Sequence, residues 1–338
     1  MKTPNFFYNK SSIVNKILPI FVFIEWLYVV IFSAIYFIKK KFSITPKIRT
    51  ICVGNSVCGG SGKTEIANLI AKILQKNGHI VAFVTKGYRR SSVNDIFIKK
   101  NQEISDQSYK NLSDEPILLS KIADVFIVKS RKNFIKNFSS QKYDFLVMDD
   151  GLSSPSIKHF MSFLLFDNLR FSGNDRFLPF GPKRIPLFLL KKLISMIVAT
   201  NIDNQTINSD IKDLSQNYFN LSSTCSTEII TECNIDENDK FLAFSGLGIN
   251  EKFFFSLRKH GVNLIKTIEF PDHHFYEIDD LNKISEIAKK FNINRIITTS
   301  KDFVKLPKQW IEKNGIVEFK ILHESNDLEK FILNKINI

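Results

Sequence analysis

A glycine-rich turn between two apolar stretches limits the possible folds of this chain more than any other feature. The residues from Arg49 to Val53 have the pattern of a short buried strand, and the turn after them ends in Gly62-Lys63-Thr64. From Glu65 to Asn77 apolar residues recur at every third or fourth position, which predicts an amphipathic helix. Strand, glycine-rich turn and helix in this order are typical of a loop that holds nucleotide phosphates.

The residue types of this turn suit ATP with Mg²⁺. We expect the phosphate-binding residues to be Val57, Cys58, Gly59, Gly60, Ser61, Gly62, Lys63 and Thr64. Glycines let backbone N–H groups point at phosphate oxygens, and the helix N-terminus adds positive potential. Lys63 would act in catalysis by neutralising phosphate charge, and the Thr64 hydroxyl would bind Mg²⁺. The common spacing has glycine where this chain has Val57, so a turn that binds nothing is the alternative.

A second segment carries the carboxylates that such a site needs. An apolar run from Phe145 to Met148 ends in Asp149-Asp150-Gly151. Open α/β sheets bind ligands at the carboxyl ends of their strands, so we expect Asp149 and Asp150 to bind Mg²⁺ together with Thr64. Taken alone, the same three residues also fit an ordinary turn.

Further apolar runs alternate with helical stretches and predict a mostly parallel sheet with helices on both faces. The fold class is therefore α/β, like that of P-loop NTPases, with a second, smaller α/β unit and an N-terminal membrane helix. We expect a membrane segment and linker over residues 1–46, a nucleotide-binding core over 47–204, and the second unit over 205–338, closing a cleft. The polar residues from Asn201 to Thr224 would form a hinge or linker. The predicted strands cover residues 80–84, 125–128, 163–166, 193–199, 241–244, 262–268 and 295–299.

The residues from Ile17 to Ile38 are long and apolar enough to cross a bilayer, with Glu25 as their one charge. Lys39, Lys40 and Lys41 follow and favour the cytoplasmic side. We expect anchoring through residues 17–38 at the cytoplasmic face of the inner membrane. A helix that lies in the membrane plane is the alternative, because Glu25 is near the middle. A cleaved signal peptide is disfavoured, because no small-residue cleavage site follows the run.

The overall charge favours anionic partners, with a general composition bias as the alternative, because the Lys residues are spread along the whole chain. The 338 residues include 47 Lys and Arg against 34 Asp and Glu, a formal charge of +13. Membrane lipids and phosphorylated substrates fit this excess, whereas no nucleic-acid-binding motif is visible and no obligate protein partner is indicated. None of the four cysteines forms a zinc-type pair, so free thiols are expected.

The loop and the Asp149 segment, with further motifs, resemble the lipid A 4′-kinases (tetraacyldisaccharide 4′-kinases). Those motifs are KGYRR at 86–90, DEP at 114–116, FLPFGPKR at 177–184, FSGLG at 244–248, FPDHH at 270–274 and TSKDFVK at 299–305. The resemblance covers nearly the whole chain, and the inward-shifted glycines of the loop match this family's own pattern. It implies an ATP-dependent kinase that transfers the γ-phosphate to the 4′-hydroxyl of a lipid A disaccharide precursor. The chain departs from the family pattern at Ser153, Ile185 and Lys86.

The resemblance also implies roles for single residues. Asp114 would be the base that accepts the hydroxyl proton, and His273 would work with it. From the residues alone, Asp114 also fits a helix cap and His273 an exposed loop residue. Arg89, Arg90 and Arg184 would contact the substrate, or else lie on a solvated surface.

A membrane-attached P-loop ATPase or GTPase that acts as a binding switch is the rival function. It would need neither the acceptor base nor a lipid site.

Overall fold

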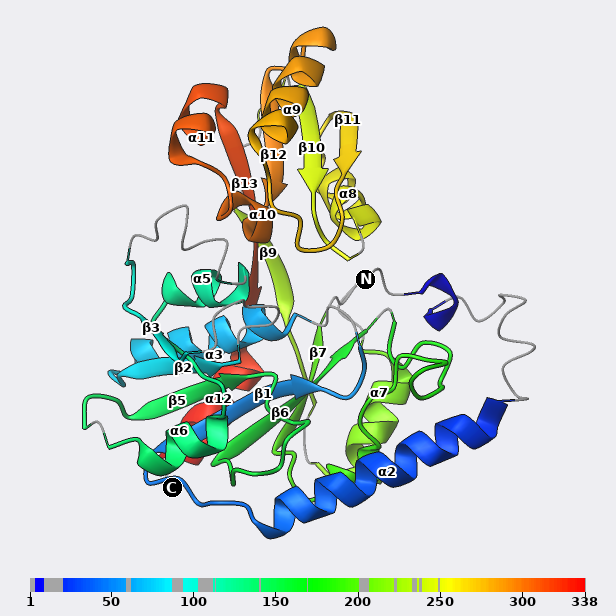
Figure 1. The fold of residues 1–338 in the computed structure, drawn as a ribbon, viewed down its shortest axis with the longest axis vertical. Helices are drawn as coiled ribbons and strands as arrows, with labels where there is room; N and C mark the ends of the chain where they lie inside the picture. Colours follow the sequence, from blue (N-terminus) through cyan, green and yellow to red (C-terminus); the bar gives the residue numbers. More distant parts are fainter. Residues whose placement is uncertain are drawn as a thin grey trace.

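The computed structural model shows two α/β units stacked along the long axis of the molecule (Figure 1). It describes residues 4–8, 21–58, 62–86, 94–102, 112, 114–139, 141–168, 170–200, 207–221, 224–232, 236, 239–248 and 250–337. The larger unit contains an eight-stranded sheet in the order β3-β4-β2-β5-β1-β6-β7-β8. Its strands pair in parallel except β3, which is antiparallel to β4. Its strands are β1 (Arg49–Asn55), β2 (Val81–Thr85), β3 (Ile96–Ile98), β4 (Asp124–Ile127), β5 (Phe145–Asp149), β6 (Met161–Asp167), β7 (Met196–Thr200) and β8 (Thr224–Ser226).

Helices cover both faces of this sheet because its buried strands direct alternate side chains to opposite sides. On β1, Ile51 and Val53 face α3 (Lys63–Lys76), whereas Cys52 faces the layer that contains α2 (Val22–Lys41). The other described helices of this unit are η1 (Asn5–Phe7), α5 (Asp114–Ser120), α6 (Arg131–Asn137), η3 (Leu187–Leu189), α7 (Ser209–Asp213), the π-helix η4 (Leu214–Tyr218) and α12 (Asn326–Ile336).

The smaller unit has a five-stranded sheet in the order β11-β10-β12-β13-β9. Strands β11, β10, β12 and β13 are parallel, and β9 pairs antiparallel with β13. One face packs against α9 and α11, and the other packs against α8. Its elements are β9 (Glu228–Glu232), β10 (Phe241–Ser245), α8 (Asn250–Lys259), β11 (Leu264–Glu269), α9 (Ile278–Lys290), β12 (Arg295–Thr299), α10 (Ser300–Phe303), α11 (Lys308–Asn314) and β13 (Ile316–Glu324).

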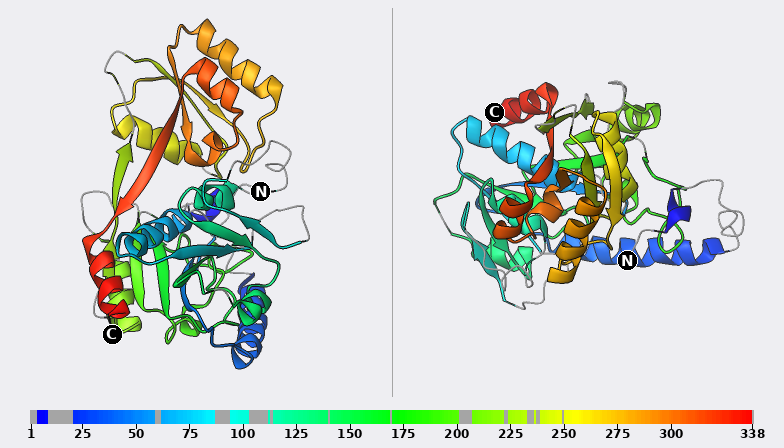
Figure 2. Two further views of the ribbon diagram at one scale, coloured as in Figure 1. Left: turned by 90° about the vertical axis from the view of Figure 1, so that its left-hand side faces the viewer. Right: turned by 90° about the horizontal axis from the view of Figure 1, so that it is seen from above.

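The α/β prediction is confirmed, and each predicted strand corresponds to an observed one. The ends are as predicted for β12 (Arg295–Thr299) and differ by one to three residues for the others. The division at residues 204 and 205 stays a prediction, although the chain crosses between the units more than once. Strand β8 extends the larger sheet, and α12 returns to that sheet after the smaller unit is complete (Figure 2). The antiparallel pair β9–β13 forms the connection between the two units.

The polar stretch from Asn201 to Thr224 is not a free linker where it is described. Ile211 and Phe219 are buried in the larger unit's core, with Ile207 and Leu214 packed beside them. These apolar residues have helical spacing, which the surrounding Asn and Ser residues obscured. Residues 201–206 and 222–223 lie outside the described part of the chain.

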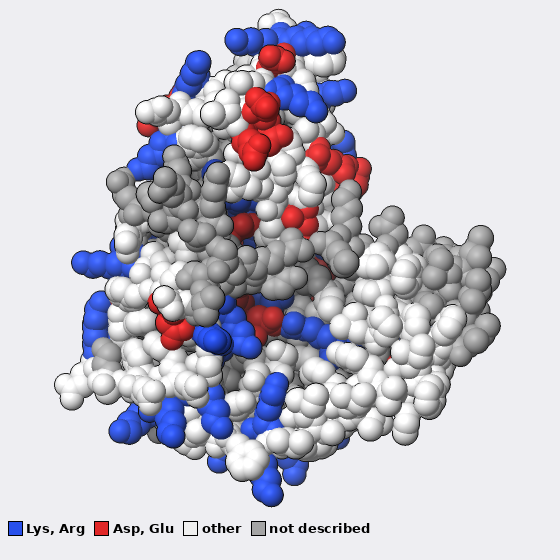
Figure 3. Space-filling view, in the orientation of Figure 1, with Lys and Arg blue, Asp and Glu red and all other residues white. Residues whose placement is uncertain are grey.

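Helix α2 lies along the side of the larger unit rather than projecting from it (Figures 1 and 2). By length and composition it could cross a membrane. Tyr36 and Glu25 are buried against the core, while Phe23 and Trp26 are 70% and 60% exposed. Figure 3 shows an uncharged band along α2, with Lys and Arg side chains gathered near its C-terminal end.

Candidate active site

The phosphate-binding loop starts where β1 ends. Ser56, Val57 and Cys58 are described, Gly59, Gly60 and Ser61 lie outside the described residues, and α3 begins at Lys63. Val57 pairs as an antiparallel bridge with Lys183, and the Cys58 N–H donates to the Pro182 carbonyl at 2.7 Å. Extended backbone of this kind accepts a β-branched residue, which accounts for valine where glycine is usual.

Gly62 ends the loop in the left-handed region, with φ of 72°. A side chain is strained in that conformation, so the turn into α3 requires glycine. The helix that follows has the expected amphipathic pattern, with Ile66, Ile70 and Leu74 fully buried against the sheet. The backbone therefore points the first turn of α3, and with it Lys63 and Thr64, at the ends of β1 and β5.

Thr64 and Asp149 lie together at this edge of the sheet, as predicted. The Thr64 hydroxyl donates to Asp149 Oδ2 at 3.3 Å, and both side chains are buried. Within the described part of the chain, Asp149 Oδ1 is buried without a hydrogen-bond partner. Burial and the nearby Glu115 raise the pKa of Asp149 to about 7. A buried, unpaired carboxylate oxygen beside a threonine hydroxyl suits a divalent cation. Such an ion would offset the cost of burying the Asp149 carboxylate in its ionised form.

The described residues contain no cluster of three or more His, Cys, Asp or Glu side chains that could hold a metal alone. A Mg²⁺ ion commonly takes one or two protein ligands and completes its shell with phosphate oxygens and water. The positions of Thr64 and Asp149 suit such a pair of ligands, and their metal role stays a prediction.

Asp150 is directed elsewhere. The Arg184 guanidinium donates to both of its carboxylate oxygens, one at 3.0 Å, and also to Asn55 Oδ1 at 2.7 Å. Although burial opposes ionisation, Arg184 lowers the pKa of Asp150 to about 2. The metal role of Asp150 and the substrate role of Arg184 stay predictions, but in this structure each group neutralises the other. Arg89 and Arg90 lie outside the described residues.

The smaller unit brings His273 to Asp114. His273 Nδ1 lies 3.0 Å from Asp114 Oδ2, although the two residues are 159 positions apart in the chain. Asp114 is the first residue of α5, and its carboxylate also lies 3.7 Å from Lys305 Nζ. Burial alone would raise the pKa of Asp114, but His273 and Lys305 bring it below its usual value. The hydrogen bond to Asp114 in turn raises the pKa of His273.

The segment that follows β12 holds this pair in place. Thr299 caps α10, and Asp302 accepts from the Gly246 N–H at 3.0 Å and pairs with Lys305 at 2.7 Å. His273 has a positive φ of 58°, and its N–H donates to the Gly246 carbonyl at 3.0 Å. Two motifs of the smaller unit therefore meet at one turn and present His273 to the larger unit.

Lys301, on α10, is a further cation that the smaller unit places near the nucleotide loop. Its Nζ lies 3.7 Å from Glu115 Oε1 on α5. Burial alone would lower the pKa of Lys301, but the carboxylates of Glu115 and Glu65 raise it. Lys301 thus carries a charge between the Asp114 region and the first turn of α3.

Sequence reasoning missed Arg131. This buried side chain donates to the backbone carbonyls of Asp149 and, at 3.1 Å, of Asp150, so it supports the turn that carries both carboxylates. It also lines a pocket of about 180 Å³ with three lysines, and none of the described residues that line it is acidic. The four cations are Lys86, Lys129, Arg131 and Lys132. The signal was present in the basic run Lys129-Ser130-Arg131-Lys132, which follows β4 at the same edge of the sheet.

Two departures from the family pattern have visible structural settings. Ile185 is buried in the core beside α2, where an acidic residue would be unpaired, and Lys86 lines the basic pocket.

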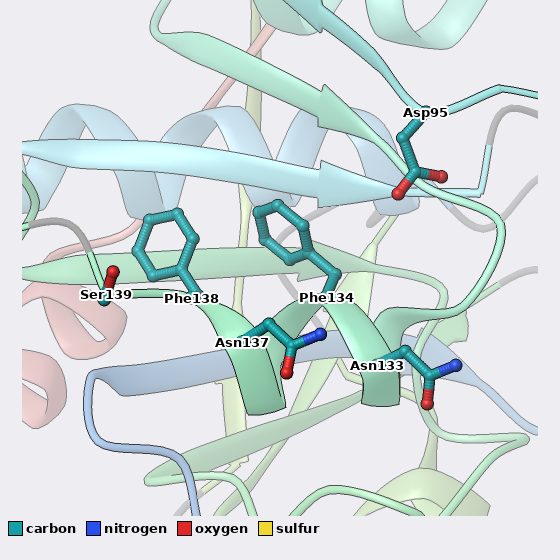
Figure 4. A pocket seen from close by; sticks show the side chains of 6 residues that line it. All are labelled: Asp95, Asn133, Phe134, Asn137, Phe138 and Ser139. Carbon is teal, nitrogen blue, oxygen red and sulfur yellow. The ribbon is translucent and has the colours of Figure 1, made fainter.

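A larger, shallow pocket of about 500 Å³ lies between the start of β3 and α6. It is lined by Asp95, Phe134 and Phe138 among others (Figure 4). None of the predicted site residues that the structure describes lines this larger pocket.

The parallel strands around the GKT loop are those of a P-loop protein, and the smaller unit adds the contact between His273 and Asp114. The model of the family "Tetraacyldisaccharide-1-P 4'-kinase" matches residues 15–337. The chain belongs to this family, whose members are ATP-dependent kinases of lipid A biosynthesis.

Individual proteins agree with this assignment. The chain is 34% identical over 302 residues to the tetraacyldisaccharide 4'-kinase of Pelagibacter ubique, covering 88% of this chain and 86% of that protein. The enzyme of the same name from Rickettsia canadensis is 28% identical over 89% of this chain and 87% of its own length. A crystal structure of LpxK from Aquifex aeolicus, described as an "apo" form in complex with ATP, shares the fold with a TM-score of 0.69. It is 20% identical, and the match covers 96% of this chain and 99% of that one.

Proposed function

We propose that this protein transfers the γ-phosphate of ATP to the 4′-hydroxyl of a lipid A disaccharide precursor that carries a 1-phosphate. The observation that carries the proposal is the contact of His273 with Asp114 at 3.0 Å, beside a loop whose Thr64 meets the buried Asp149. In this proposal the larger unit would contribute the phosphate site, and the two units together would contribute the acceptor side. The rival function of a nucleotide switch leaves the Asp114–His273 pair without a use.

Phosphoryl transfer passes through a loose transition state, so the protein acts mainly by positioning and by charge neutralisation. Lys63 and the backbone of residues 57–62 would hold the β- and γ-phosphates, and Thr64 and Asp149 would hold Mg²⁺. The ion would neutralise negative charge on the phosphates. Lys301 would add positive charge from the smaller unit.

Asp114 would accept the proton of the 4′-hydroxyl as the new P–O bond forms and the bond from the γ-phosphorus to the β–γ bridging oxygen breaks, with ADP as the leaving group. Its lowered pKa keeps it ionised at neutral pH, and the hydroxyl becomes a strong acid only late in the reaction. His273 would orient the Asp114 carboxylate and share its charge. Both residues are mostly buried, which keeps bulk water away from the carboxylate.

The basic pocket beside Arg131 is the second part of the proposal. Lys86, Lys129, Arg131 and Lys132 present four cations that suit a phosphate group of the lipid. The pocket adjoins the end of α2, because Lys132 Nζ donates to the Phe42 carbonyl at 2.6 Å. A lipid held at the membrane by its acyl chains could therefore place its 1-phosphate here and its 4′-hydroxyl toward Asp114.

The lipid substrate implies a membrane location. Residues 17–38 would anchor the protein to the cytoplasmic face of the inner membrane, where Lys39–Lys41 meet anionic headgroups. Because α2 packs along the core through Tyr36 and Glu25, an in-plane position fits better than an isolated span.

The decisive experiment incubates purified protein with ³²P-labelled ATP, Mg²⁺ and a tetraacyl disaccharide 1-phosphate in detergent micelles. Radiolabel in the lipid, absent for Lys63→Ala, supports the proposal. ATP hydrolysis at equal rates with and without the lipid, and no label in the lipid, would instead support the switch function.

A further inference from the structure

Glu25 is a buried acidic residue of α2, whereas the side of α2 that faces away from the core is apolar around it. Its residue is 9% exposed, whereas its neighbour Trp26 is 60% exposed. An unpaired buried charge costs several kcal/mol, so a carboxylate in this place requires a partner. The inner face of α2 therefore has a function separate from that of the apolar outer face.

The partner of Glu25 is a loop 151 residues further along the chain. Arg176 Nη1 donates to Glu25 Oε1 at 2.6 Å, and the Phe177 N–H donates to Glu25 Oε2 at 3.2 Å. Aromatic contacts flank this ion pair, with Phe21 stacked on Phe180 at 5.3 Å between ring centroids. We call residues 174–185 the 174–185 loop.

A second contact lies one helical turn further along α2. Tyr28 donates its hydroxyl proton to the Arg184 carbonyl at 2.7 Å, near the other end of the 174–185 loop. The loop is also tightly folded: a Cβ at Gly181 would lie 2.3 Å from the Arg176 carbonyl oxygen. A loop held at both ends and packed this closely transmits a shift of one end to the other.

The same loop forms the wall of the phosphate-binding loop. The Cys58 N–H donates to the Pro182 carbonyl at 2.7 Å, and the Arg184 N–H donates to the Ser56 carbonyl at 2.9 Å. Val57 bridges to Lys183, and the Arg184 guanidinium holds Asp150. Every described residue between β1 and Gly62 thus contacts the loop that α2 holds.

We propose that Glu25 and Arg176 are positioning residues that couple the membrane-facing helix to the phosphate-binding loop. The outer face of α2 lies in the plane of the membrane, and the inner face holds the 174–185 loop, which in turn keeps Ser56–Cys58 in the shape that receives ATP. The inference rests on the proposed function only in that residues 57–64 bind ATP. It assigns to the helix an effect on nucleotide affinity that a simple anchor would not have.

The test compares Glu25→Gln, Arg176→Gln and the double variant with wild type, all full length. ATP affinity is measured by equilibrium dialysis with labelled ATP, in detergent and with phosphatidylethanolamine–phosphatidylglycerol vesicles, and membrane binding by vesicle sedimentation. We expect each single variant to raise the Kd for ATP about tenfold, the size of one charged hydrogen bond. The double variant should be no weaker than either single one, and vesicle binding should stay within about twofold.

Trp26→Ser is the matched control, because Trp26 is adjacent in sequence but on the outer face. It should weaken vesicle binding and leave the Kd for ATP in detergent unchanged. Should Glu25→Gln unfold, Tyr28→Phe carries the test, since it removes only the hydroxyl that bonds to Arg184 and should raise the Kd about threefold.

Wild-type ATP affinity in the folded Glu25 and Arg176 variants, or in Tyr28→Phe if that variant is needed, would overturn the inference alone. A wild-type protein that binds no ATP would overturn the proposed function, and this inference with it.

Discussion

Replacing Asp114 by Asn tests the acceptor side of the site with a change of little more than one charge. Asn has the size of Asp, and Lys305 keeps its 2.7 Å contact with Asp302, so the local structure should persist. The substituted side chain loses the proton acceptor and the ionic part of its 3.0 Å contact with His273. General bases contribute about 10²- to 10⁴-fold to rate, so kcat should fall within that range. The KM for ATP should change less than about twofold, because Thr64 and Asp149 are untouched.

The pH dependence of stability gives a second readout of the same pair. The pKa of His273 is higher in the folded protein than in the unfolded chain, where it is about 6.5. The contribution of His273 to the free energy of unfolding is therefore fully present below about pH 6.5 and is lost as the pH rises through the pKa of the folded state. The pKa of Asp114 is lower in the folded protein than in the unfolded chain, where it is about 4. The contribution of Asp114 to the free energy of unfolding is therefore present above about pH 4 and is lost as the pH falls through the pKa of the folded state. Asp114→Asn should flatten the dependence of the unfolding temperature on pH at both limits.

A matched control for the His273–Asp114 pair is the pair formed by the next residue, His274, with Asp280. His274 Nε2 contacts Asp280 Oδ2 at 2.9 Å, a similar pair that closes the start of α9. Asp280→Asn should lower the unfolding temperature slightly and leave kcat near wild type. The double variant Asp114→Asn with His273→Ala should be much less than additive in kcat. A fully active Asp114→Asn enzyme, or additive losses in the double variant, would refute the reasoning.

Three further predictions follow from the phosphate site, the membrane helix and the basic pocket. Lys63→Ala and Thr64→Ala should each lower kcat/KM at least about 10²-fold in the lipid kinase assay, and near-normal turnover in either would rule out the loop assignment. Removal of residues 1–42 should reduce sedimentation with vesicles, since it removes the exposed apolar face of α2; equal pelleting would contradict the anchor. Lys132→Met should raise the KM for the lipid about tenfold but not that for ATP, whereas Lys136→Met, on the exposed side of the same helix, should change neither. A substrate without the 1-phosphate should abolish the difference between the two variants, and a difference that remains would exclude a phosphate contact.

The parts of the site that are local in sequence could be predicted from sequence. The loop from Val57 to Thr64 and the turn at Asp149 each lie within one strand and the residues next to it, so periodicity and composition locate them. That Asp114 meets His273 follows from no local pattern, because it depends on how two units dock. Only the family resemblance indicated it, and the residues alone favoured a helix cap.

Other features depend on partners that are distant in the chain. Glu25 looked like an interruption of a membrane segment because Arg176 lies 151 residues away. Arg131 received no prediction, since its acceptors are backbone carbonyls that no sequence pattern marks. Strands β3, β8, β9 and β13 were not predicted. Strands β3 and β8 have three residues each, too few for an alternation to be visible, whereas Ile316 and Phe319 of β13 do contribute to the smaller unit's core.

The return of α12 to the larger sheet has a consequence for how this protein is made. Leu328 and Ile332 are fully buried beside Ile70 and Phe163, so the core that α3 begins is completed by residues 326–336. At 5 to 20 residues per second, the roughly 250 residues between these helices take on the order of 12 to 50 s to synthesise. During that interval the part of the core beside α3 that Leu328 and Ile332 will cover stays exposed, while the apolar N-terminal helix can already reach the bilayer. The larger unit therefore cannot complete its core before the smaller unit has been translated, because residues 326–336 are synthesised last.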